Sequence, residues 1–298
     1  MRLRARLWCA ALLTAGLAAT LHAWQWPVSG PALHATFGTE AGGFVLRGVQ
    51  IEGSEPGVYP VEAGVVVAVV ARRDGSDSGL PSALGSYVVV DHDNSFRSVY
   101  AHLEPEYLPA IGQVVGPATR IGTVGSSGQI DRRSLRLYVI DLESGEYVNP
   151  LLLLPDLPDR SAPQVLEVYA ADGEVLFDVR LLHELPPGPY EIVARIWDRA
   201  APATGAVGFA PYSVRFVAGG QEIFAVTKDR MRIEPQAARV EPGAINTQAL
   251  YNADGLYRLG TIEVPHGSIE ITIIARDLAG NATTFTTNIS SRTEEASE

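Results

Sequence analysis

Short apolar runs separated by glycine dominate the chain from residue 24 to residue 150. The clearest runs contain many β-branched and aromatic residues and cover Gly64–Val70, Ser86–Asp91, Arg97–Tyr100 and Ser134–Ile140. Alternating or short continuous apolar runs of this kind are typical of β-strands. No long window shows helical periodicity, because Gly or Pro interrupts the chain about every ten residues. We therefore expect an all-β first half.

A proline-rich stretch separates this half from the rest of the chain. Three prolines lie between Leu151 and Pro163, and proline ends regular structure because it lacks a backbone N–H. The stretch predicts a first domain over 24–155, a linker over 156–162 and a second domain over 163–292. The polar tail at 293–298 is expected to be disordered.

Two segments of the second half echo each other. Gly188–Asp198 and Gly267–Asp277 each start at a turn, continue as an alternating strand and end at an aspartate, and the second runs on into a turn that ends at Asn281. Such strands recur in β-sandwiches. The pattern resembles the last strands of immunoglobulin-like or fibronectin-like modules. One sandwich with an insertion and two small sandwiches both fit it.

Residues 1–23 have the pattern of a secretory signal peptide. Three arginines lie in the first six positions, an apolar run follows from Leu7 to Leu21, and Ala23 closes the segment. The run is shorter than the roughly 20 residues of a spanning helix, which favours a cleaved signal peptide. The alternative is that the segment is retained as a membrane anchor. The only cysteine, Cys9, lies in this run, so no disulfide or thiolate metal site is available after cleavage. We expect an exported protein, periplasmic or on the cell surface, with no transmembrane segment once the signal is removed.

The charge balance argues against a nucleic-acid partner. The formal net charge is −11. The first 23 residues contain three arginines and no acidic residue, so the remaining chain is three charges more negative, near −14. Electrostatically driven binding to DNA or RNA needs a basic surface. We expect none.

A series of motifs in the first half follows one family order. They are His34–Gly38, Leu46–Ile51, Val58–Val67, Gly85–His92, Tyr100–Leu103, Ile121–Gly128, Arg133–Leu137 and Val148–Pro150. Together, residues 34–154 resemble the β-sheet core of the M23 family of zinc metallopeptidases, the lysostaphin-like or LytM-like enzymes that cut peptide cross-links in bacterial cell walls. The resemblance implies the fold of that family for this half.

The resemblance also implies a zinc site whose ligands this sequence lacks. Family members bind zinc through the His and Asp of a His-x-Gly-x-Asp motif and the second His of a His-x-His motif. The matching positions hold Leu46, Gln50 and Arg136. Leucine offers no donor atom, a neutral amide is a poor zinc ligand, and arginine places a fixed positive charge at the metal position. We therefore expect no metal and no cofactor.

Two further family positions assist catalysis and match His102 and Ser134. Without zinc, a histidine there has no activated water to act on, so both residues are interpreted as vestigial. His102 either ties down a strand end or keeps a binding role. Strand alternation aims Arg136 at the former metal position, where we expect it to hydrogen-bond Gln50, Ser134 or His102. These residues and Leu46 are the candidates for a binding groove.

Substitute ligands would have to come from other polar residues of the first half. The available ones are His34, Glu52, Asp91, His92, His102, Asp131 and Asp141. No pair of them reproduces a ligand spacing on one strand with a third ligand opposite.

Three functions remain open from the sequence. The first is a catalytically inactive exported scaffold that binds peptidoglycan, or that regulates a cell-wall hydrolase or another envelope protein. The alternative is an active zinc metalloendopeptidase that cleaves peptidoglycan cross-links through unorthodox ligands. The third is a structural surface protein. Fold alone does not choose among them.

Overall fold

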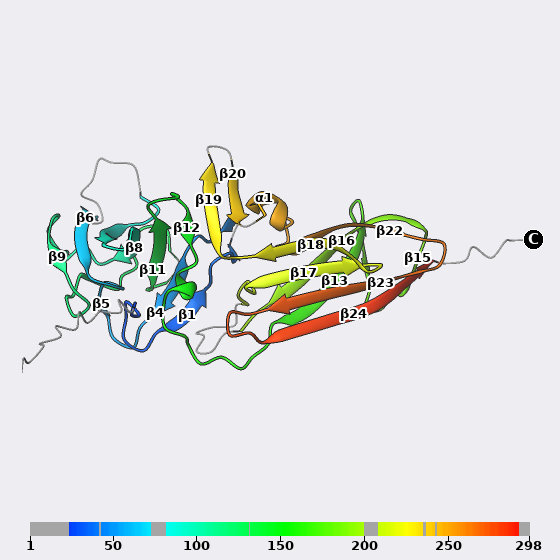
Figure 1. Cartoon of the computed structure of the whole chain (residues 1–298), viewed down its shortest axis with the longest axis horizontal. Helices are drawn as coiled ribbons and strands as arrows, with labels where there is room; N and C mark the ends of the chain where they lie inside the picture. The colour runs from blue at the N-terminus through cyan, green and yellow to red at the C-terminus, as the bar shows by residue number, and fades with distance from the viewer. Residues whose placement is uncertain are drawn as a thin grey trace, which may run out of the picture.

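The computed structural model describes residues 24–41, 43–72, 82–130, 132–199, 208–234, 237–241 and 243–291. The signal peptide expected at 1–23 and the tail at 293–298 lie outside these residues. The described chain is almost entirely β, with one short helix, α1 (Thr247–Leu250), and one 3-10 turn at Pro150–Leu152, so the all-β prediction is confirmed. It forms an elongated molecule with two β bodies along its long axis (Figure 1). No helix among the described residues is long and apolar enough to cross a membrane.

One large antiparallel sheet organises the first body. Its strands from this half are β1 (Ala32–Ala35), β4 (Val49–Glu52), β6 (Gly64–Val70), β7 (Ser86–His92), β8 (Phe96–Leu103), β9 (Val114–Val115), β11 (Leu135–Asp141) and β12 (Tyr147–Val148). They are ordered β12-β11-β8-β7-β6-β9, and β4 pairs with both β1 and the start of β11. Two small ladders flank the sheet, β2 (Glu40–Ala41) with β3 (Phe44–Val45) and β5 (Gly57–Val58) with β10 (Gly122–Thr123).

Alternation along β11 fixes which face of the sheet carries the core. Leu135, Leu137 and Val139 are fully buried in the hydrophobic cluster of this body. Arg136 and Tyr138 lie between them and are half-buried. Since successive strand side chains point to opposite faces, Arg136 lies on the face away from the core.

The second half extends the same sheet. Strands β19 (Arg230–Glu234), β20 (Ala237–Glu241) and β21 (Ile245–Asn246) continue it beyond β12 in the order β12-β19-β20-β21. Three ion pairs among the described residues cross this junction: Arg230 to Asp141 at 2.6 Å, Arg230 to Glu146 at 3.6 Å and Arg232 to Glu146 at 2.6 Å. The sequence did not predict this pairing. It couples the two halves through backbone hydrogen bonds as well as side chains.

The second body is a β-sandwich. One sheet has the order β14-β13-β16-β22 and the other β15-β24-β23-β17-β18. Their strands are β13 (Gln164–Asp172), β14 (Val175–Asp178), β15 (Glu184–Leu185), β16 (Gly188–Trp197), β17 (Ser213–Ala218), β18 (Gln221–Thr227), β22 (Tyr257–Val264), β23 (Ser268–Arg276) and β24 (Ala282–Ser291). Buried side chains of both sheets, among them Ile192, Phe216 and Ile273, belong to one hydrophobic cluster. The segment from β19 to α1 is inserted between β18 and β22. The exact domain bounds stay a prediction.

Candidate functional site

Three neighbouring strands bring the vestigial residues together. In the register of β4 and β11, Gln50 lies opposite Arg136, and on the other side of β11 Arg136 lies opposite Ala101 of β8. Ser134 directly precedes β11, and His102 follows Ala101. The sheet therefore brings Gln50, Arg136, Ser134 and His102 to neighbouring positions.

Leu46 lies in the loop before β4. Its backbone N–H donates to the carbonyl of Thr39, and its own carbonyl accepts from Gly38. The side chain is half-buried. As a hydrocarbon it can contribute only apolar contact to a groove.

The side chains of Gln50 and Ser134 form a hydrogen bond with each other. The Gln50 Nε2 donates to the Ser134 Oγ at 2.8 Å. Ser134 is 0% exposed and Gln50 8%, so this bond is formed away from solvent, where leaving either group unpaired would cost about 1–3 kcal/mol. Two positions that carry metal-binding or catalytic groups in the family are thus occupied by a neutral hydrogen-bonded pair.

His102 is held in one orientation by the backbone. It has a left-handed φ of 65° and is 0% exposed, and its Nδ1 lies 2.8 Å from the carbonyl oxygen of Ser127. A carbonyl only accepts, so Nδ1 carries the proton. Burial, opposed by this hydrogen bond and reinforced by the charge of Arg136, lowers the pKa of His102 to about 4. His102 is therefore neutral at pH 7, with an acceptor at Nε2 that has no partner among the described residues.

Arg136 departs from the expected arrangement. We expected Arg136 to hydrogen-bond Gln50, Ser134 or His102, but in the described part of the chain it makes none of these bonds. The reason is that Gln50 and Ser134 pair with each other, and the buried Nε of Arg136 has no hydrogen-bond partner. Its charge still acts on the site, since it contributes to the lowered pKa of His102.

These residues do not fit a zinc ion. A catalytic zinc needs three convergent lone-pair donors and one open position. Among the residues at this site, His102 Nε2 is the only free nitrogen lone pair, the amide oxygen of Gln50 is a poor zinc ligand, and a guanidinium lies beside the histidine. A fixed cation at a ligand position opposes a second cation there.

The substitute ligands are engaged elsewhere. His34 pairs with Glu52 at 2.6 Å, and His92 bonds the carbonyl of Ala63 and the hydroxyl of Ser98. Asp91 pairs with Arg97 and Asp141 with Arg230, and Asp131 lies outside the described residues. None of these residues belongs to the one described group of three acidic or histidine side chains that lie close enough to share an ion.

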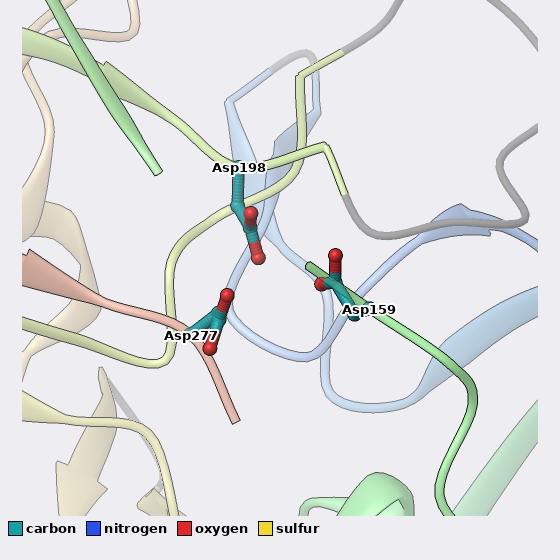
Figure 2. A group of neighbouring side chains, drawn as sticks. All are labelled: Asp159, Asp198 and Asp277. Carbon is teal, nitrogen blue, oxygen red and sulfur yellow. The ribbon is translucent and has the colours of Figure 1, made fainter. Parts of the chain in front are cut away.

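That group lies at the junction of the two bodies and was missed from the sequence. It consists of Asp159, Asp198 and Asp277 (Figure 2). Burial, together with the charges of the other two carboxylates, raises the pKa of Asp198 to about 7. The sequence feature that could have indicated this group is the similar pattern of Gly188–Asp198 and Gly267–Asp277, because Asp198 and Asp277 end the two segments.

Comparison with known proteins supports the fold of the first half. The model of Peptidase family M23 matches residues 45–150, and a separate family model matches residues 162–292. The Outer membrane antigenic lipoprotein B of Haemophilus influenzae is 29% identical over 132 residues, which cover 44% of this chain and 29% of that protein. The chain thus spans less than a third of the length of this curated relative.

Two solved structures resemble part of this chain at low similarity. The SpoIIQ–SpoIIIAH pore forming complex contains a chain with 18% identity and a TM-score of 0.36, covering 45% of this chain and 92% of that one. A zinc containing peptidase from Vibrio cholerae has 22% identity and a TM-score of 0.35, covering 46% of this chain and 41% of that one. The family match places the sheet of residues 45–150 among M23-type domains, and the chain carries this domain beside a separate C-terminal β-sandwich.

Proposed function

We propose that the chain is an exported, non-catalytic M23-type scaffold that binds peptidoglycan or a cell-wall hydrolase in the envelope. One observation carries the proposal: the hydrogen-bonded pair of Gln50 and Ser134 lies beside Arg136, which is the cross-strand partner of Gln50. At the positions where the resemblance to M23 enzymes implies metal-binding and catalytic groups, this chain has an amide, a hydroxyl and a fixed cation, none of which is a good zinc ligand.

The positive charge of Arg136 indicates what such a site could recognise. Cell-wall peptides present carboxylates and amide carbonyls, both of which accept hydrogen bonds. Arg136 is half-buried and has donors to offer, and an arginine-to-carboxylate hydrogen bond is stronger than a neutral one. Because His102 and Ser134 are fully buried, contact with a partner falls mainly on Arg136 and Leu46.

The location in the envelope rests on two observations. The first 23 residues have the pattern of a signal peptide. The curated relative that matches 44% of this chain is named an outer membrane lipoprotein. Both support export of this chain.

Co-sedimentation with purified cell-wall sacculi tests the proposal, using the full chain and an Arg136→Gln variant. Arg215→Gln is the matched control, because Arg215 is an exposed arginine of β17 that pairs with Glu222. The wild type and the control should bind sacculi without releasing soluble fragments. Loss of one charged hydrogen bond should weaken binding of Arg136→Gln by about tenfold.

The same samples should also be assayed for stimulation of a purified wall hydrolase, since regulation is the other form of the scaffold role. Soluble fragments whose release is stopped by a chelator would favour the alternative, an active endopeptidase. If the chain neither bound sacculi nor changed the activity of the hydrolase, that result would contradict the scaffold proposal.

A further inference from the structure

The loop over residues 36–46 belongs to the first half of the chain but packs against the second half. Phe37 is 2% exposed and belongs to the hydrophobic cluster of the β-sandwich. Val45, at the end of β3, packs against the same cluster. In the opposite direction, Phe209 of the second half belongs to the hydrophobic cluster of the first body. The two bodies therefore share side chains between their cores at this loop.

The hydroxyl of Tyr251 holds the loop at Gly38. Tyr251 directly follows α1, is 9% exposed and donates to the Gly38 carbonyl at 2.8 Å. Its hydroxyl oxygen also lies 2.9 Å from that of Tyr257, the first residue of β22. Gly38 has a left-handed φ of 86°, and a side chain there would overlap the stem of Lys228. Three residues of the second half thus enclose this one position of the loop.

Ala210 holds the loop at a second point. Its backbone N–H donates to the Thr39 Oγ1 at 3.1 Å, and its carbonyl accepts from the Thr36 Oγ1 at 3.3 Å. Both threonines are 7% exposed. Because buried polar groups are costly to leave unpaired, these bonds tie Thr36 and Thr39 to the second half.

The same loop residues hold the backbone of Leu46. The N–H of Gly38 donates to the Leu46 carbonyl at 2.8 Å, and the N–H of Leu46 donates to the Thr39 carbonyl at 2.9 Å. Gly38 and Thr39 therefore bond to the second half on one side and to Leu46 on the other. A continuous path of hydrogen bonds runs from Tyr251 and Ala210 through these two residues to Leu46.

We propose that the second half of the chain positions the Leu46 side of the groove, with Tyr251 as a positioning residue that acts through Gly38. The inference rests on the proposed function, in which Leu46 is one of the residues that contact a partner. Coupling between separate groups travels through contiguous packed and hydrogen-bonded networks. The sandwich and its inserted segment are then a working part of the binding site, and a change in them reaches the groove.

A Tyr251→Phe variant of the full chain tests this proposal. It keeps the ring and removes the hydrogen bond to the Gly38 carbonyl. Amide hydrogen exchange, measured by NMR, should become about tenfold faster at Gly38 and Leu46, because the loop opens locally more often. The activity that the wild type shows, sacculus binding or stimulation of the hydrolase, should weaken about fivefold, because Leu46 is no longer held in place.

Tyr190→Phe is the matched control. Tyr190 is also buried, at 5% exposed, and its hydroxyl donates to the carbonyl of Pro186 at 3.1 Å within the second half. Each variant loses one buried hydroxyl-to-carbonyl bond, so both should lower the Tm by a similar amount, about 2–4 °C. Only Tyr251→Phe should change the exchange at Leu46 and the activity, which a purely structural role would not do.

The other contact point provides a second test that does not depend on Tyr251. Thr39→Val removes the acceptor of the Ala210 N–H and should have the same two effects, whereas Thr39→Ser keeps the hydroxyl and should restore both. Equal exchange at Leu46 in Tyr251→Phe and Tyr190→Phe, or faster exchange with unchanged activity, would overturn the proposal. A wild type without either activity would contradict the proposed function, while the exchange comparison would still decide whether Tyr251 holds Leu46.

Discussion

In metal-free buffer, the free energy of unfolding should rise by about 3 kcal/mol between pH 7 and pH 9.5, and Lys228→Met should remove most of that rise. Lys228 is the only lysine in the sequence and is 0% exposed. Burial lowers its pKa to about 7, and the opposing attraction of Asp198 does not restore it. The unfolded chain holds this proton up to about pH 10.4.

The sign follows from proton counting. Between pH 7 and about pH 10.4 the unfolded state binds one more proton at Lys228 than the folded state does, so stability increases with pH by up to about 1.4 kcal/mol per unit. The methionine side chain fits the same space, because the lysine stem packs where Gly38 has no side chain. It cannot titrate, so its stability curve should be flatter.

Denaturant unfolding at several pH values below 9.5, where tyrosines remain protonated, measures both proteins. A direct check uses ¹³C-labelled lysine, which gives one side-chain resonance because the chain has one lysine. That resonance should titrate near pH 7. Titration near pH 10.4, or equal pH dependence in the two proteins, would contradict the burial argument.

The second large effect is a gain of zinc binding. The triple variant Leu46→His, Gln50→Asp, Arg136→His should bind one equivalent of zinc that a chelator removes. Positions 50 and 136 are cross-strand partners, so their Cβ atoms lie about 4.5–5.5 Å apart, close enough for two ligands of one metal. The third donor completes the set that a catalytic zinc needs.

The double variant Gln50→Asp, Arg136→His is the matched control, because it has two of the three donors. It should bind zinc much more weakly than the triple variant does. Elemental analysis after dialysis, with circular dichroism to confirm folding, measures the difference. A folded triple variant with no more zinc than the double variant would show that the backbone no longer supports the site.

Local patterns explain which parts of the fold were predictable. The runs expected as strands at 64–70, 86–91, 97–100 and 134–140 are found as β6, β7, β8 and β11, because their apolar positions match a half-buried or buried strand. The pairing of β12 with β19 was not predictable. It joins Tyr147 to Met231, and a register between such distant segments depends on packing that no local pattern records.

The sequence indicated on which strand face Arg136 lies, but it did not indicate which hydrogen bonds the side chains of the candidate site form. Strand alternation correctly placed Arg136 on the face away from the core. It could not show that Gln50 would donate to Ser134 instead, since that choice depends on side-chain geometry. The meeting of Asp159 with Asp198 and Asp277 likewise required the path of the connecting segment.

Elemental analysis of the purified full chain tests the central claim, that the M23-type domain holds no catalytic zinc. The protein should be prepared with zinc in excess, dialysed and incubated with cell-wall sacculi, with Asp159→Asn in parallel to exclude metal bound at the acidic cluster. We expect no stoichiometric zinc in Asp159→Asn and no release of soluble peptide fragments by either protein. One equivalent of zinc retained by Asp159→Asn, with fragment release that a chelator stops, would contradict it.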